Sequence, residues 1–129
     1  METKASLNDS LEDYRVYQAA RKLFDAIWDD FDILNRDVRG HELVRQQVRS
    51  LDSICANIEE GYARGFGKEW PHYLRIARGS ARESRGRFER CARLLPADVL
   101  EQRTSSLNQI IGGLTKTIVT AERKLAAKR

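Results

Sequence analysis

Few residues in this 129-residue chain have types and spacings suited to chemistry. The two histidines are His41 and His72, and the two cysteines are Cys55 and Cys91. Nothing in the spacing positions a Cys/His pair as nucleophile and base, and the metal-binding spacings C-x2-C and H-x3-H do not occur. Cysteines at apolar helical positions usually act as small hydrophobic residues. We therefore expect no catalytic residue, no metal, no cofactor and no enzymatic activity.

Arginines at helical spacing are the strongest signal for binding. Arg75, Arg78, Arg82 and Arg85 recur at steps of three, four and three, which keeps them within about 80° of one helix face. Guanidinium groups suit bidentate contact with phosphate oxygens, but one such face follows a backbone without reading base sequence. The candidate nucleic-acid-binding residues are Arg64, Lys68, Arg75, Arg78, Arg82 and Arg85. The alternative is that acids of neighbouring helices or another subunit pair with these arginines.

Two other motifs imitate known sites. The segment 61–69 resembles a phosphate-binding loop, but Tyr62 stands where that loop needs glycine and Glu69 where it needs Ser or Thr. Arg36 and His41 form R-x4-H, which resembles the active-site motif of helical HEPN-type ribonucleases. Arginine is so common here that this spacing arises easily by chance, and the motif falls in a predicted connection.

Four segments must position these residues. Apolar residues recur at steps of three and four over 17–34, 44–62, 70–95 and 100–125, which places each set on one stripe of a helix. The mean step of 3.5 allows a slight left-handed supercoil, and the short connections favour antiparallel neighbours. The pattern predicts an all-α, up-down-up-down, left-handed, antiparallel four-helix bundle. The residues expected in its core include Leu51, Ile58, Leu74, Phe88, Leu107 and Leu114.

Helix boundaries carry local signals. Ser10 is a candidate cap of the first helix, Pro71 fits the first turn of the third, and Pro96 ends it. The pair Gly112-Gly113 costs about 2 kcal/mol in a helix interior, yet the apolar stripe keeps its phase, so we expect one helix there. We expect a flexible tail over 1–10, a single bundle domain over 11–125 and a frayed end over 126–129.

Two features favour self-association. The first helix has an apolar arc wider than a coiled-coil seam requires, with Trp28 beyond its stripe. The third helix carries small residues on two sides, because Gly79 and Gly86 lie away from the Ala77–Ser84 stripe. We therefore expect assembly into a closed homo-oligomer. The alternative is that the wide apolar arc of the first helix is an ordinary core face within one chain.

The charge distribution and the cysteine content limit the kinds of binding partner and the cellular compartment. Residues 1–63 hold 13 acidic and eight basic residues, whereas 64–93 hold three acidic and nine basic ones. Such asymmetry attracts polyanions even though the net charge is only +4. No apolar run reaches the roughly 20 residues of a membrane span, the first ten residues lack a signal core, and two cysteines fit a reducing compartment. We expect a cytoplasmic protein without membrane contact.

Two linked motifs resemble a known family. Residues 53–61 read SICANIEEG and residues 73–83 read YLRIARGSARE. They are similar to the S-I-x-x-N-I-A-E-G and F-L-x-I-A-x-G-S-x-x-E patterns of the bacterial four-helix-bundle family named after proteins encoded in intervening sequences of 23S rRNA genes. The likeness covers roughly 11–95, with Glu59 where alanine is usual. Asn57 and Glu83 match the pattern off the apolar stripes, where they could bond across helices or subunits.

The resemblance implies a homopentamer around a central channel and transfers no enzymatic residue. The chain is also similar to the accessory protein of diversity-generating retroelements, which implies RNA, DNA or a reverse transcriptase as partners. Two readings stay open. The chain is a non-enzymatic oligomer that binds nucleic acid through the third helix, or it is a structural or partner-binding scaffold without nucleic-acid contact.

Overall fold

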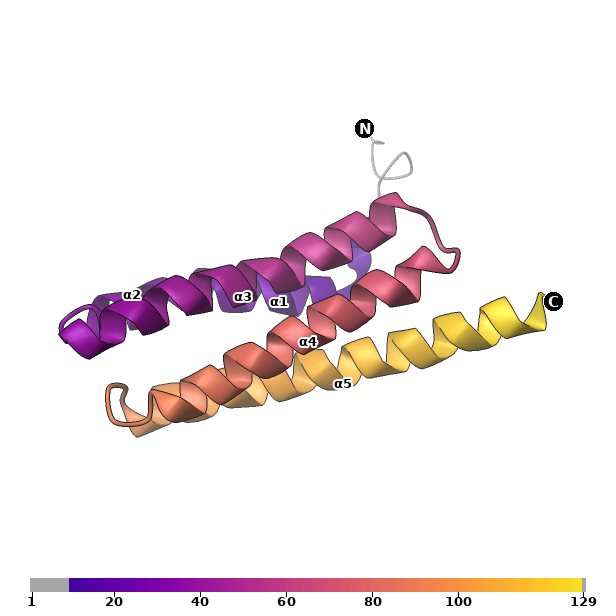
Figure 1. The fold of residues 1–129 in the computed structure, drawn as a ribbon. Helices are drawn as coiled ribbons and strands as arrows, with labels where there is room; N and C mark the ends of the chain where they lie inside the picture. Colours follow the sequence, from indigo (N-terminus) through magenta and orange to yellow (C-terminus); the bar gives the residue numbers. More distant parts are fainter. Residues whose placement is uncertain (1–9, 129) are drawn as a thin grey trace, which may run out of the picture.

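The computed structural model describes residues 10–128, which form helices and no strand (Figure 1). The helices are η1 (Ser10–Asp13), α1 (Arg15–Ala26), α2 (Trp28–Leu34), α3 (Val38–Ala63), α4 (Glu69–Arg90) and α5 (Ala97–Ala127). The prediction of an all-α chain with four helical segments is confirmed, with α1 and α2 together forming the first segment. The predicted tail falls largely on residues 1–9, which lie outside the described residues.

The first helix is interrupted, which the periodicity did not predict. Ile27 separates α1 from α2. At this break the Arg103 guanidinium of α5 donates to the Ala26 carbonyl at 3.2 Å and to the Asp30 carboxylate. The side chain of α5 thus satisfies a carbonyl at the end of α1. The predicted Ser10 cap is also wrong, because Ser10 begins the short η1 helix and Tyr14 precedes α1 without a side-chain cap.

The four segments enclose one core. Figure 1 shows α3, α4 and α5 side by side with short connections at alternate ends, and α1 contacts both α3 and α5. All six residues predicted for the core are at most 1% exposed. They are Leu51, Ile58, Leu74, Phe88, Leu107 and Leu114. The spacing of three and four therefore selected the buried face of each helix correctly.

Glycine and proline act at the positions where backbones must approach or helices must start. Gly40, in the first turn of α3, lies so close to the Leu34 backbone that a Cβ would collide with its carbonyl. A Cβ on Gly113 would collide with a side-chain methyl group of Val16 on α1, and α5 runs through Gly113 without a break, as predicted. Pro71 lies in the first turn of α4 and Pro96 directly precedes α5.

Candidate nucleic-acid interface

The predicted arginine face of α4 lies along its contact with α5. Arg78 Nη1 donates to Thr115 Oγ1 at 3.1 Å, and Arg85 Nη1 donates to Asn108 Oδ1 at 2.8 Å. Both acceptors are neutral, so these bonds orient the two guanidinium groups without cancelling their charge. The α5 side chains thus hold the ends of this face in place.

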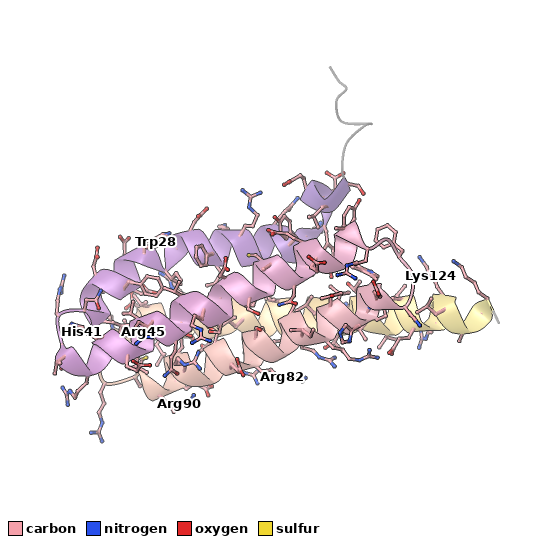
Figure 2. The ribbon with its side chains drawn as sticks, turned by 45° about the horizontal axis from the view of Figure 1, so that its top comes forward. Trp28, His41, Arg45, Arg82, Arg90 and Lys124 are labelled. Atoms are coloured by element: carbon pink, nitrogen blue, oxygen red, sulfur yellow. The ribbon has the colours of Figure 1, made fainter. Side chains whose placement is uncertain are left out.

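Arg82 lies between these two arginines on the same face. It is exposed and makes no hydrogen bond or ion pair with the described part of the chain, and Figure 2 shows it projecting from α4. Arg78, Arg82 and Arg85 therefore form a run of three guanidinium groups without an acidic partner. We call these three residues the α4–α5 arginines.

The other candidate cations are placed differently. Arg75 forms an ion pair with Glu122 of α5. Arg64 pairs with Glu60 at 2.8 Å and with Glu69 at 3.2 Å, and its guanidinium lies 5.4 Å from the centre of the Tyr73 ring.

Because Arg64 and Arg75 pair with acidic residues, only part of the predicted site consists of unpaired cations. Both pairs are nearly half exposed, and exposed pairs contribute little, so a polyanion can compete for them. Lys68 is exposed in the α3–α4 connection, where Gly65 takes a positive φ of 82°. Of the six candidate residues, the three α4–α5 arginines thus lie together without an acidic partner. The other three lie around the start of α4.

A second polar surface joins α3 to α4, on the side of α4 away from α5. Asn57 Nδ2 donates to Ser53 Oγ at 2.9 Å, and Ser53 Oγ lies 2.7 Å from Ser80 Oγ. Asn57 therefore bonds within its own helix, and the serine pair crosses between helices. Next to it, the buried Gln47 donates to the Ser84 carbonyl at 3.2 Å and accepts from the Ser84 hydroxyl at 3.0 Å.

The Ser53–Ser80 contact lies in a groove of about 370 Å³, which we call the α3–α4 groove. Its lining residues are Glu42, Gln46, Arg49, Ser50, Ser53, Ser80, Glu83 and Arg87. Arg49 and Arg87 are not among the residues predicted from the sequence, because they belong to different helices and only packing brings them to one groove. The polar positions of the two matched motifs were the available signal, since Ser53, Ser80 and Glu83 all line it.

The residues considered for catalysis remain apart. His41 Nε2 lies 3.1 Å from the Asn35 carbonyl at the α2–α3 corner, and Arg36 is exposed nearby. Cys55 and Cys91 are free and buried. Burial, and then the charges of Glu59 and Asp52, raise the pKa of the Cys55 thiol to about 11. Burial also raises the pKa of Cys91, so neither thiol is an activated nucleophile.

The described part of the chain offers neither a metal-ion site nor a membrane-spanning helix. Over residues 10–128, no three His, Cys, Asp or Glu side chains gather in a way that would hold a metal ion. Within the same range, every helix is too short or too polar to cross a membrane.

Comparison with known proteins supports the fold. A family model described as 23S rRNA-intervening sequence protein matches residues 12–118. A crystal structure of a protein of unknown function from the S23 ribosomal protein family of Bacteroides thetaiotaomicron matches with a TM-score of 0.73. At 22% identity, the match covers 80% of this chain and 97% of that chain, so the two share a fold. No curated protein matches this chain.

Proposed function

This chain belongs to the 23S rRNA-intervening sequence protein family, and we propose that it is a non-enzymatic, oligomeric helical protein that binds the backbone of RNA or DNA. The observation that carries the proposal is the set of α4–α5 arginines. Two of them are oriented by neutral oxygens of α5, and the third has no partner in the described chain. Oriented, uncompensated guanidinium groups are the donors that phosphate oxygens select.

The arrangement favours contact with phosphates over reading of bases. The three arginines follow one side of a single helix, and the helix seam they border offers hydroxyl and amide groups rather than an aromatic ring. Contacts of this kind fix position on a backbone and carry little sequence information. We therefore expect similar affinity for unrelated sequences and a steep loss of affinity with salt, because each neutralised phosphate releases counterions.

A salt titration tests the proposal. Binding of unrelated RNA and DNA oligonucleotides is measured for the parent, for Arg78→Gln/Arg82→Gln and for a control, Arg15→Gln/Lys22→Gln, which removes two exposed charges from α1. We expect the first pair to weaken binding to every oligonucleotide and to reduce the salt slope by about one per arginine. Absence of binding at low salt, or equal losses for both pairs, would contradict it.

We also propose that the bundle is antiparallel and left-handed and closes into a homo-oligomer, a pentamer by family resemblance. Contacts between α4 and α5 support the antiparallel order, because Arg75 meets Glu122 whereas Arg85, farther along α4, meets Asn108. A ring would repeat the α4–α5 arginines and multiply weak phosphate contacts into useful avidity. We place this assembly in the cytoplasm.

The second candidate function is a protein-binding scaffold, with a reverse transcriptase as one possible partner. A mostly apolar pocket of about 240 Å³ favours it. Phe66 is 60% exposed there and lies beside Trp70, Ala121 and Lys124. If the scaffold reading is right, Phe66→Ala will weaken binding of a protein partner in a pull-down, while Arg78→Gln/Arg82→Gln will leave it unchanged.

A further inference from the structure

We infer that the α3–α4 groove is a phosphate-binding site in which Arg49 and Arg87 hold the anion, separate from the α4–α5 arginines. The ligand is a phosphate group carried either by a small phosphorylated metabolite or by the phosphorylated end of a nucleic acid. The groove therefore adds a second kind of contact that the proposed function does not require.

Arg87 is held in position by neutral acceptors. Its Nη1 lies 3.0 Å from Ser50 Oγ, 3.3 Å from the Gln46 carbonyl and 3.4 Å from Gln47 Oε1. Glu83 lies one turn earlier on α4, at the spacing that commonly forms a helix ion pair, yet Arg87 contacts these α3 oxygens instead. A guanidinium has five N–H donors, so Nε and Nη2 remain available while the side chain is already oriented.

Arg49 supplies the second charge from the opposite wall. It is exposed, lines the groove and makes no hydrogen bond or ion pair within residues 10–128. Ser53 and Ser80, bonded to each other at 2.7 Å, add hydroxyl groups between the two arginines' helices. Arg90 of α4 lies toward the same end of the bundle (Figure 2) and increases the positive potential there.

The acids of the groove do not cancel this charge. Glu42 is occupied, because its Oε1 pairs with Arg45 at 3.4 Å and its Oε2 accepts from Gln46 at 2.9 Å. Glu83 is exposed and unpaired over the described range, so it opposes a bound anion. Two arginines against one free carboxylate leave the groove positive. Loss of the Glu83 charge should therefore tighten anion binding.

The size of the groove fits a phosphate with its attached group. Its volume of about 370 Å³ lies at the low end of the roughly 300–1,000 Å³ typical of small-molecule sites. Its lining is hydroxyl, amide and charged groups, which suits an anion better than an apolar ligand. The groove is open to solvent along the α3–α4 face, so a longer chain attached to the phosphate can leave it.

The test uses the full chain and three probes: inorganic phosphate, a 5′-phosphorylated dinucleotide and the same dinucleotide without that phosphate. Binding is followed by calorimetry and by the NMR signals of the arginine Nε–H groups. We expect Arg49→Gln to weaken binding of the two probes with a free or terminal phosphate roughly tenfold, as expected for loss of a charge-assisted hydrogen bond. Arg87→Lys should also weaken it, because lysine lacks the guanidinium fork. Glu83→Gln should tighten it.

Arg15→Gln is the matched control, since it removes one exposed α1 arginine outside the groove. It should change phosphate-probe binding less than twofold if a built site binds the anion. Equal losses for Arg49→Gln and Arg15→Gln, or no binding of inorganic phosphate, would overturn the inference. Preference for inorganic phosphate indicates a small phosphate ligand, and preference for the phosphorylated dinucleotide over both other probes indicates a nucleic-acid end. Loss of oligonucleotide binding in Arg78→Gln/Arg82→Gln alone supports the proposed function and is independent of this result.

Discussion

Arg103 of α5 and Asp30 of α2 form a buried ion pair at the break in the first helix. Nε lies 2.7 Å from Oδ2 and Nη2 lies 3.2 Å from Oδ1, while the side chains are 15% and 2% exposed. The same Nη2 reaches the Ala26 carbonyl at 3.2 Å. One guanidinium therefore neutralises a buried carboxylate and satisfies the end of α1.

We expect Arg103→Ala to lower the free energy of unfolding by about 3–5 kcal/mol, because it leaves a buried carboxylate without its partner. The measurement is urea denaturation followed by circular dichroism. Arg45→Ala is the control, since it breaks the exposed pair with Glu42 and should cost less than about 1 kcal/mol. A loss in Arg103→Ala as small as that of the control would contradict the prediction.

The central core residues should carry much of the stability. Leu74 and Leu107 are both fully buried, on α4 and α5. Leu74→Ala or Leu107→Ala should each cost about 2–5 kcal/mol, from lost apolar burial and the cavity left behind. Val38→Ala provides the comparison, because Val38 is 78% exposed and its truncation should change stability little. Equal effects at Val38 and Leu74 would contradict the assignment of the core.

The sequence predicted the four-segment fold because the apolar period is strong along every segment. Leu74, Phe88, Leu107 and Leu114 follow helical spacing, and all are buried. The break at Ile27 escaped the same reasoning, since its stripe continues in phase from α1 into α2. At the break, Arg103 bonds to the Ala26 carbonyl from more than 70 positions away, and local periodicity carries no information about such a contact.

The candidate site was predictable only within a single helix. The steps of three and four placed Arg78, Arg82 and Arg85 on one face, and the structure keeps them together there. The residues of α5 decide which of these arginines lack an acidic partner. Thr115 and Asn108 are neutral, whereas Glu122 pairs with Arg75. The α3–α4 groove could not be found this way, because its arginines come from two helices whose register only packing determines.

The two central glycines of α5 should respond in opposite directions. A Cβ on Gly112 would meet no atom within 4 Å, whereas a Cβ on Gly113 would collide with Val16. Gly112→Ala should stabilise the chain by up to about 1 kcal/mol through better helix propensity. Gly113→Ala should destabilise it, because the β-branched Val16 side chain, or α1 with it, must shift to make room. Thermal unfolding of the two variants is the measurement, and stabilisation by both would refute the close approach of α1.

Stability should fall in alkaline solution. The pKa of Cys55 rises from 9.0 to about 11 on folding, through burial first and then Glu59 and Asp52. The unfolded chain loses this proton at lower pH than the folded chain does, so the stabilisation is complete below pH 9 and is lost between pH 9 and 11. Urea midpoints across this range should decline less in Cys55→Ala. Burial also raises the pKa of Tyr17, so a residual decline is expected in that variant.

The outer face of α4 should determine the assembly. Gly79 is exposed, and a Cβ there would meet nothing within 4 Å in the chain, yet glycine in a helix interior costs about 1 kcal/mol relative to alanine. No contact within one described chain accounts for that cost, whereas close approach of a second copy would. Ile76, 41% exposed on the same helix, adds apolar surface beside it.

We therefore expect the parent to elute and scatter light as a multiple of its 14.8 kDa mass. Gly79→Leu should shift it toward the monomer while retaining its helical content. Gly112→Leu adds the same side chain at another exposed glycine, on α5, and should leave the assembly intact. A monomeric parent at micromolar concentration would rule out the closed ring, and with it the avidity that a repeated arginine face supplies.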